Sequence, residues 1–312
     1  MHTSTTFGGS RLSRLKLFIA LSRTPHGLLD MTTPALGAVL WLGAIPPLPV
    51  ILLGCLTAFA GYTAVYALND VVDYRVDREK LRLCGLPCTS NDLDAVYARH
   101  PLAQGLLSLK EGILWTAAWG TVAVMGAYAL NPLCAVVFLV ACLAETIYCL
   151  LLKVSYLRTV VSGIVKTAGG IAAVFAVAPN PSFTFVFFFF LWLFLWEIGG
   201  QNIPNDICDA TEDKDLRAET VPVRFGMRRS TTVITGCLIS AVLLSLLLHQ
   251  LTPARLSPLY LPGALLSGVF LLLLPALKLL RSGETRYASV LFNKASYYPL
   301  TMFAVTLMST AV

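Results

Sequence analysis

Nine apolar segments, each roughly 20 residues long, run through this chain and limit what it can fold into. A helix rises only ~1.5 Å per residue, so about 20 apolar residues are needed to cross the core of a bilayer. Apolar residues make up 56% of the sequence and charged residues 13%, and the mean hydropathy is +0.73, unlike a soluble domain. We predict an all-α, polytopic membrane protein that forms one domain over residues 1–312. The predicted spans are 27–45, 48–68, 112–130, 133–152, 158–178, 183–200, 231–250, 258–277 and 291–311.

The basic residues indicate how these helices are oriented. If the N-terminus is cytoplasmic, nearly all of the 23 Lys and Arg fall in cytoplasmic segments; the exceptions are Arg255 on the opposite side and Lys166 and Lys294 within spans. This asymmetry follows the positive-inside rule. It predicts a multi-pass protein, of the inner membrane if the source is bacterial, with its N-terminus in the cytoplasm. The net charge of +6 then reflects topology and not a nucleic-acid partner.

Two long polar segments, 69–111 and 201–230, separate the spans, and both open with the pattern Asn-Asp-x-x-Asp-x-x-x-Asp. Each copy follows an apolar stretch, at the depth where carboxylates are costly unless a cation or a function holds them. At these spacings the four side chains of one copy share a helix face. The first acidic motif is Asn69, Asp70, Asp73 and Asp77, and the second acidic motif is Asn205, Asp206, Asp209 and Asp213.

Paired acidic motifs at one membrane surface predict a diphosphate held by Mg²⁺, because Mg²⁺ prefers oxygen ligands and is typically bound by one or two carboxylates together with substrate phosphates. Neither segment has the spacing of an EF-hand calcium loop. Basic residues such as Arg78 and Arg217 flank the motifs and could contact phosphate. Lys166 lies far inside an apolar span, where a lysine usually faces a cavity or a partner, although it could also snorkel.

Two glutamates, Glu145 and Glu197, also occur in or near apolar spans, and either could pair with a lysine or accept a proton from a reacting ring. Aromatic residues crowd the span 183–200. Rings on every side of a helix are expected to face lipid or neighbouring helices more often than a reacting carbocation.

The acidic motifs resemble the signatures of the UbiA superfamily of intramembrane prenyltransferases. The segment ALNDVVDYRVDREK matches the family's Asn-x-x-x-Asp-x-x-x-Asp signature at Asn69, Asp73 and Asp77. The segment NDICDATEDKD matches the second signature, Asp-x-x-x-Asp, at Asp209 and Asp213.

Two further segments are similar to the same family. HPLAQGLLSLKEG is similar to its Arg-Pro-Leu-x-x-Gly segment, which leads into the third helix, and ETVPVRFG to its Lys-Thr-(Leu/Ile)-Pro-Val-x-x-Gly ending of the second loop. The chain departs from the pattern at His100, where Arg is usual, and at Glu219, where Lys is usual.

The resemblance implies a nine-helix bundle with a cytoplasmic polar cap over a lipid-accessible chamber, closed by the segment 78–110. A polyprenyl diphosphate would bind there through Mg²⁺, with the lipid bilayer as a further partner. The expected Mg²⁺ ligands are Asp73, Asp77, Asp209 and Asp213, and the expected catalytic residues are these four with Asn69 and Lys153. The expected substrate-binding residues are Asp70, Asn205, Asp206, Arg78, Lys166 and Arg217.

The leading functional hypothesis is transfer of an isoprenyl group to a small aromatic acceptor, such as 4-hydroxybenzoate or another quinone precursor. A non-aromatic acceptor and a UbiA-type terpene cyclase are alternatives within the family. A cation transporter is an alternative from another class, but transporters place their sites near the bilayer midplane, whereas both acidic motifs are predicted at one edge.

Overall fold

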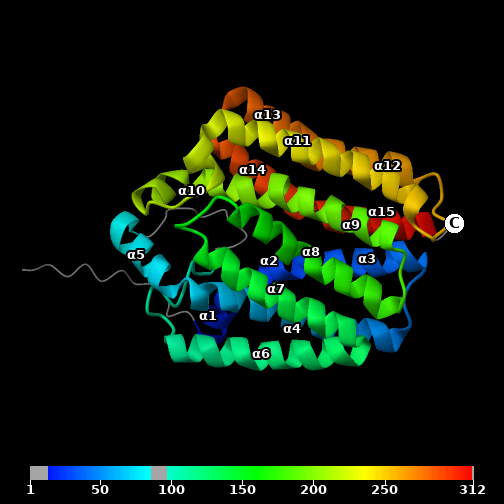
Figure 1. The fold of residues 1–312 in the computed structure, drawn as a ribbon, viewed down its shortest axis with the longest axis horizontal. Helices are drawn as coiled ribbons and strands as arrows, with labels where there is room; N and C mark the ends of the chain where they lie inside the picture. Colours follow the sequence, from blue (N-terminus) through cyan, green and yellow to red (C-terminus); the bar gives the residue numbers. More distant parts are fainter. Residues whose placement is uncertain (1–12, 86–96, 311–312) are drawn as a thin grey trace, which may run out of the picture.

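The computed structural model describes residues 13–85 and 97–310, and in these ranges every regular element is a helix. The predicted all-α class is confirmed. Most helices run side by side along the long axis of the molecule, and α5 and α10 meet at one end of it (Figure 1). In chain order the elements are α1 (Arg14–Leu21), α2 (Thr24–Asp30), α3 (Thr32–Leu42), α4 (Leu48–Val72), α5 (Tyr74–Cys84), α6 (Leu109–Leu130), α7 (Pro132–Leu150), α8 (Arg158–Val177), α9 (Phe183–Trp196), η2 (Glu197–Asn202), α10 (Ile203–Asp215), α11 (Val221–Leu251), α12 (Tyr260–Gly268), η3 (Val269–Leu273), α13 (Leu274–Ser282), α14 (Thr285–Ser296) and α15 (Tyr298–Thr310).

Within the described residues, seven helical runs are long and apolar enough to cross a membrane by length and composition. They coincide with the second to the eighth predicted spans, most of them extended by several residues. The first and ninth predicted spans, 27–45 and 291–311, are each divided into shorter helices, so nine uninterrupted spans are not observed. The seven runs are Leu48–Val72, Leu109–Leu130, Pro132–Leu150, Arg158–Val177, Phe183–Asp215, Val221–Leu251 and Tyr260–Ser282.

Pro34 explains why the first predicted span is divided into α2 and α3. Proline has no backbone N–H, and its ring clashes with the carbonyl four residues earlier, here that of Asp30. The Thr33 hydroxyl donates a 2.9 Å hydrogen bond to that carbonyl. The helix is interrupted at Met31, and the Asp30 side chain stays inside the bundle, where the residue is 4% exposed.

A proline also divides the ninth predicted span, between α14 and α15. Pro299 cannot bond to the carbonyl of Ala295, and the indole N–H of Trp196 donates to that carbonyl instead, at 3.0 Å. Trp196 is 1% exposed. The Ala295 carbonyl, which the proline leaves without a backbone partner, therefore accepts a hydrogen bond from a side chain of α9.

The polar segments 69–111 and 201–230, expected to form the cap of the site, both begin as helices. α4 continues to Val72, α5 follows directly after Asp73, and α10 occupies the start of the second segment. At the α4–α5 junction the Asp73 N–H still donates to the Asn69 carbonyl, at 2.9 Å. The first acidic motif therefore keeps helical spacing. Residues 86–96 lie outside the described residues, so closure of the site by the segment 78–110 stays a prediction.

The largest apolar core lies where α9 packs against α11 and the C-terminal helices. Phe185, Phe189, Trp192 and Trp196 are at most 1% exposed in it, whereas Phe183 on the same helix is 82% exposed. Among the described residues, none of the α9 rings lines the large cavity of the bundle. The expectation that these rings face neighbours or lipid is confirmed.

Candidate functional site

One cavity of about 650 Å³ runs through the bundle and ends at the helices that carry the acidic motifs. The first motif reaches it from the end of α4 and the start of α5, and the second from α10. The expectation that both motifs face one pocket is met. The motif residues that line the cavity are Asn69, Asp70, Asp73, Asp77, Asn205, Asp206, Asp209 and Asp213.

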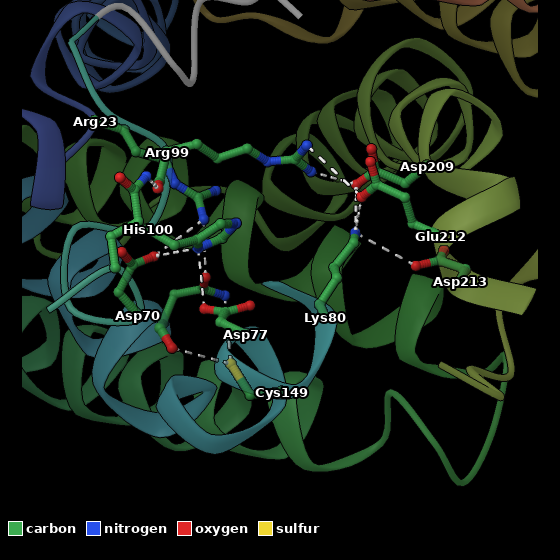
Figure 2. A network of polar contacts seen from close by, with 12 residues as sticks. Arg23, Asp70, Asp77, Lys80, Arg99, His100, Cys149, Asp209, Glu212 and Asp213 are labelled. Atoms are coloured by element: carbon green, nitrogen blue, oxygen red, sulfur yellow. Dashed lines mark hydrogen bonds and ion pairs between the residues drawn. The ribbon is translucent and has the colours of Figure 1, made fainter. Parts of the chain in front are cut away.

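His100 lies between two carboxylates of the first acidic motif, as Figure 2 shows. Its Nδ1 is 2.9 Å from Asp77 Oδ2 and 3.3 Å from Asp70 Oδ1. The potential ligand atoms of these three residues all lie within 4.8 Å of one another. Asp70 and Asp77 are seven residues apart, two helical turns, which is why their side chains share a face.

Asn69 is oriented by charged residues on both sides of its amide. Its Oδ1 accepts a 3.0 Å hydrogen bond from Arg23, which also lies 3.4 Å from Asp70. Its Nδ2 donates to Glu145 Oε1 at 2.7 Å. Glu145 on α7 is thus part of the support of the first motif.

Two basic side chains, Lys80 and Arg99, extend to the second acidic motif (Figure 2). The Lys80 ammonium lies 3.2 Å from Asp209, 3.0 Å from Glu212 and 3.7 Å from Asp213. The Arg99 guanidinium donates to Asp209 at 2.7 Å. Since Lys80 belongs to α5, three residues after Asp77, this ion pairing links the two motifs.

Arg158 and Asp206 form a more deeply buried ion pair on the same cavity. Their charged atoms are 3.6 Å apart, and the Arg158 guanidinium stacks 4.1 Å from the centre of the Tyr148 ring. Among the described residues, Asp206 Oδ2 and Asn202 Oδ1 are buried without a hydrogen-bond partner. Buried oxygens in this state are costly unless a ligand completes them.

Burial and neighbouring charges shift the pKa values of those groups at this end of the cavity that lie outside the membrane spans. Burial, followed by repulsion from Asp77, raises the pKa of Asp73 to about 6. Burial opposes the charged form of His100, but the Asp77 and Asp70 carboxylates outweigh it and raise its pKa to about 9. For Lys80, too, burial is outweighed, by Asp209 first, and its pKa is raised.

The donors at this end of the cavity fit magnesium. They are carboxylate and amide oxygens from two facing helices, including the unpartnered Asp206 Oδ2, and Mg²⁺ prefers oxygen ligands. His100 contributes nitrogen, and its raised pKa makes it a cation here. We interpret His100 as a counter-ion to the carboxylates and not as a ligand.

A second polar group lies deeper in the cavity, around Lys166. The Lys166 ammonium donates to Asp30 Oδ2 at 2.6 Å and to the Tyr66 hydroxyl at 2.8 Å. The Glu197 carboxylate accepts a 2.8 Å hydrogen bond from Ser162. The Lys166 side chain therefore faces the cavity and does not snorkel toward the membrane surface, which was the other orientation considered from the sequence.

Three residues expected at the site are not among the described residues that line the cavity. Lys153 pairs with Glu79 at 2.7 Å on the surface, and Arg78 donates to the Tyr74 hydroxyl. Arg78 directly follows Asp77, so it points about 100° away from it around the helix. Arg217 lies in a left-handed conformation just after α10, with φ 57°. The expected phosphate contacts of these three residues gain no support.

Sequence reasoning missed four charged residues of the site, namely Arg23, Arg99, Arg158 and Asp30. The three arginines counted as ordinary loop charges, because their sequence positions flank spans as topology-setting residues do. Asp30 did carry a usable signal, since an ionisable residue inside a predicted span is by itself a reason to expect a function.

The chain is similar to known proteins over most of its length. Digeranylgeranylglyceryl phosphate synthase of Thermococcus sibiricus is 25% identical over 233 residues, covering 75% of this chain and 77% of the relative. The same enzyme of Thermococcus kodakarensis is 25% identical over 219 residues, covering 70% and 72%.

Two solved structures have the same fold. A UbiA homolog from Aeropyrum pernix K1 matches with a TM-score of 0.71 at 18% identity, covering 91% of this chain and 97% of that chain. A UbiA homolog from Archaeoglobus fulgidus bound to DMAPP and Mg²⁺ matches with a TM-score of 0.68 at 17% identity, covering 93% and 99%.

The family model described as the UbiA prenyltransferase family matches residues 31–298, a range that contains both acidic motifs and the whole of the cavity's polar end except Arg23, His26 and Asp30. This chain therefore belongs to the UbiA prenyltransferase family.

Proposed function

We propose that this prenyltransferase carries out Mg²⁺-dependent transfer of an isoprenyl group from a polyprenyl diphosphate to an acceptor inside the membrane. The observation that carries the proposal is that both acidic motifs line one cavity, together with the basic residues Lys80, Arg99 and Arg158. The UbiA homolog solved with DMAPP and Mg²⁺ supports it.

The residues at the polar end fit the departure of a diphosphate. Bound Mg²⁺ would neutralise the charge that develops on the leaving group, and we propose Asp73, Asp77, Asp209 and Asp213 as its ligands. Lys80 and Arg99 would then exchange their carboxylate partners for phosphate oxygens. The allylic carbocation would form below them in the apolar part of the cavity, where water that could capture it is excluded.

We propose that the acceptor is a glyceryl phosphate lipid. Both curated relatives are named for a product that consists of a glyceryl phosphate with two geranylgeranyl chains. The sequence-based hypothesis of an aromatic quinone precursor has no comparable support. The aromatic acceptor and the terpene cyclase remain alternatives to be tested. Membership of a prenyltransferase family argues against a cation transporter.

We further propose that the motif-bearing end faces the cytoplasm, as the distribution of Lys and Arg predicts. Both acidic motifs lie at the same end of the cavity, so a single orientation exposes both to Mg²⁺ from that compartment. Labelling of an engineered cysteine at position Asp215 by a membrane-impermeant reagent, in sealed vesicles of known orientation, checks this.

The function is tested with membranes that contain the protein, radiolabelled geranylgeranyl diphosphate and one of three conditions: geranylgeranylglyceryl phosphate, 4-hydroxybenzoate, or no acceptor. We expect a prenylated product with the glyceryl phosphate lipid, and its loss when EDTA removes Mg²⁺. A cyclic product without acceptor would identify a cyclase, and a prenylated ring would restore the aromatic hypothesis.

Substitution of one carboxylate in either motif tests the site itself. Asp73→Asn and Asp209→Asn each remove a proposed Mg²⁺ ligand without changing side-chain size, so transfer should fall by roughly 100-fold or more. Asp215→Asn is the matched control, because Asp215 is exposed on α10 and does not belong to the cavity lining of the described residues. Wild-type transfer in either motif variant would contradict the proposal.

A further inference from the structure

The second polar group of the cavity, which we call the midcavity cluster, consists of Asp30, Tyr66, Ser162, Lys166 and Glu197. All five residues line the cavity. Tyr66 lies one helical turn before Asp70 on α4, a distance of ~6 Å along the axis. The same offset separates Ser162 from Arg158 on α8. On both walls, therefore, the cluster begins about one turn below the acidic motifs.

That level is where the reacting carbon of a prenyl diphosphate would lie. The diphosphate is proposed to bind at the motifs, and its first prenyl carbon is joined to it through a single bridging oxygen. The prenyl chain extends from there into the apolar part of the cavity. An acceptor must bring its nucleophilic atom to the same carbon, so the groups at this level are the ones that would meet it.

Asp30 and Lys166 already satisfy one another. Asp30 Oδ2 accepts hydrogen bonds from Lys166 at 2.6 Å and from Tyr66 at 2.5 Å. His26 Nε2 lies 3.7 Å from the other oxygen, Oδ1. The Lys166 ammonium also lies 5.2 Å from the centre of the Tyr66 ring. An ion pair held this closely within the membrane fixes the geometry of the cavity wall.

Glu197 differs from Asp30 in that one of its carboxylate oxygens has no hydrogen-bond partner among the described residues. Its Oε1 accepts the Ser162 hydroxyl at 2.8 Å, whereas its Oε2 is buried with no hydrogen-bond partner among the described residues. The residue is 3% exposed. Leaving a buried carboxylate oxygen unbonded is costly, and an orphaned group of this kind in a cavity wall indicates a ligand or a function.

The local backbone explains how Glu197 reaches the cavity. It opens η2, a π-helical turn over Glu197–Asn202, and such turns are frequently found at functional sites. Pro204 cannot donate to the carbonyl four residues earlier, which favours the wider turn. Both Glu197 at the start of the turn and Asn202 at its end line the cavity.

We infer that Glu197 is the base of the transfer reaction, and this inference rests on the proposed function. The oxygen of an acceptor hydroxyl forms a bond to the first prenyl carbon, the bond between that carbon and the diphosphate oxygen breaks, and the hydroxyl proton passes to Glu197 Oε2. The electron pair of the broken bond leaves with the diphosphate. Ser162 and the Lys166 ammonium, which interacts electrostatically with Glu197, are positioning residues.

The other buried carboxylates of the region are less suited to this role. Glu145 Oε1 holds the Asn69 amide at 2.7 Å and belongs to the support of the first motif. Asp30 is bonded to Lys166 and Tyr66. A general base needs an oxygen that can take the proton of the acceptor. Asp206 Oδ2 also has no hydrogen-bond partner among the described residues, but Asp206 pairs with Arg158 at the level of the acidic motifs. Glu197 bonds instead to Ser162, one helical turn below Arg158.

The inference is tested with Glu197→Gln, which keeps the size of the side chain and an oxygen for Ser162. Three quantities are measured in purified protein: Mg²⁺-dependent binding of the non-reactive geranylgeranyl thiolodiphosphate, transfer to geranylgeranylglyceryl phosphate, and transfer to the analogue with a thiol in place of the acceptor hydroxyl. Glu284→Gln, at an exposed glutamate, is the matched control.

We expect Glu197→Gln to bind the thiolodiphosphate within about twofold of wild type and to lose roughly 100-fold or more of its transfer to the hydroxyl acceptor, the usual effect of removing a general base. Transfer to the thiol should lose much less, because a thiol gives up its proton far more readily than an alcohol. The control should match wild type in all three measurements.

Three results would overturn the assignment of the base: transfer near wild type in Glu197→Gln, an equal loss with both acceptors, or a loss of thiolodiphosphate binding. The last two would show that Glu197 has a structural role. If the wild-type protein itself binds the thiolodiphosphate but transfers to neither acceptor, the proposed acceptor fails instead, and the inference fails with it.

Discussion

His100 and Arg23 hold left-handed backbone conformations, with φ of 50° and 43°, and both reach the first acidic motif. For residues other than glycine, such conformations cost about 1–3 kcal/mol and persist only where the surroundings compensate. For His100 the compensation is its pairing with Asp77 and Asp70. The imidazolium thus occupies, in this chain, the position at which the sequence comparison with the family expects an arginine.

The charge of His100 predicts a pH dependence of the stability of the protein without Mg²⁺. Its folded-state pKa of about 9 lies above the ordinary value of 6.5. The contribution to stability is therefore fully present below pH 6.5 and is lost as the pH rises through 9. In EDTA we expect the thermal midpoint to fall by a few degrees over this range. Asp73, with a pKa of about 6, titrates below the window.

His100→Arg is the control for this measurement. Arginine stays protonated throughout the range, so the variant should keep a nearly constant midpoint between pH 6.5 and 9. His100→Gln should start lower and also stay constant, because it has no charge to lose. A midpoint that falls equally in all three proteins would mean that another group titrates.

The apolar pattern predicted seven helices well, but it failed for the first and ninth spans, each of which is divided beside a proline. Pro34 lies inside the first predicted span, but a sequence does not say whether such a proline bends a helix or divides it. The answer depended on Thr33 satisfying the freed Asp30 carbonyl, which is a contact of the folded structure. The spacing of the acidic motifs indicated one helix face for each, but the bounds of α5 and α10 were not predicted, because apolar periodicity is absent from the polar segments.

The π-helical turn η2 depends on two glycines that pack against different helices. A Cβ on Gly199 would lie 2.9 Å from Cys237 Cβ and 3.0 Å from the Ile234 carbonyl of α11. A Cβ on Gly200 would lie 2.9 Å from Ala295 Cβ of α14. Only residues without a side chain let the turn approach both helices, and this approach sets where Glu197 enters the cavity.

Gly199→Ala should therefore displace η2, because the Ile234 carbonyl is backbone and cannot move aside easily. We expect a loss of stability of roughly 1–3 kcal/mol, as for other overpacked sites, and a fall in transfer larger than the fall in thiolodiphosphate binding. Thermal midpoints and transfer rates in detergent check this.

Gly236→Ala is the matched control on the facing helix α11. A Cβ at Gly236 meets nothing within 4 Å, and alanine favours a helix over glycine by about 1 kcal/mol. This variant should be as stable as wild type or slightly more so. If Gly199→Ala behaves in the same way, the close approach of η2 to α11 does not position Glu197.

The sequence could predict that both acidic motifs lie at one surface of the membrane, because four predicted spans separate the helix ends that carry them. It could not predict the cations that pair with them. Arg23 precedes α2, Arg99 follows the segment 86–96 and Arg158 starts α8, so their convergence depends on how α1, α5 and α8 pack. Charge counting assigns such residues to topology and gives no distance to the motifs.

The cavity extends well beyond the site, to Val50 near the opposite end of the bundle. Along α4, Val50 lies 23 residues before Asp73, which corresponds to about 35 Å. Its deep walls are apolar, with Phe303 and Leu307 contributed by α15. A long prenyl chain therefore has room to extend away from the acidic motifs, and the depth of the cavity should limit the length of the donor.

Ala58 offers a way to shorten this space without touching the site. It lines the cavity about 22 Å from Asp73 along α4. Ala58→Phe should reduce transfer from geranylgeranyl diphosphate by roughly tenfold, a cost near 1.4 kcal/mol. Transfer from geranyl diphosphate should stay nearly unchanged, because the shorter chain ends before it reaches the new ring.

Leu56→Phe is the control variant. It adds the same ring on the exposed side of α4, where Leu56 is 51% exposed, and should alter neither rate. Equal effects of Ala58→Phe on both donors would mean that the chain leaves the cavity above this level, between helices and into the bilayer.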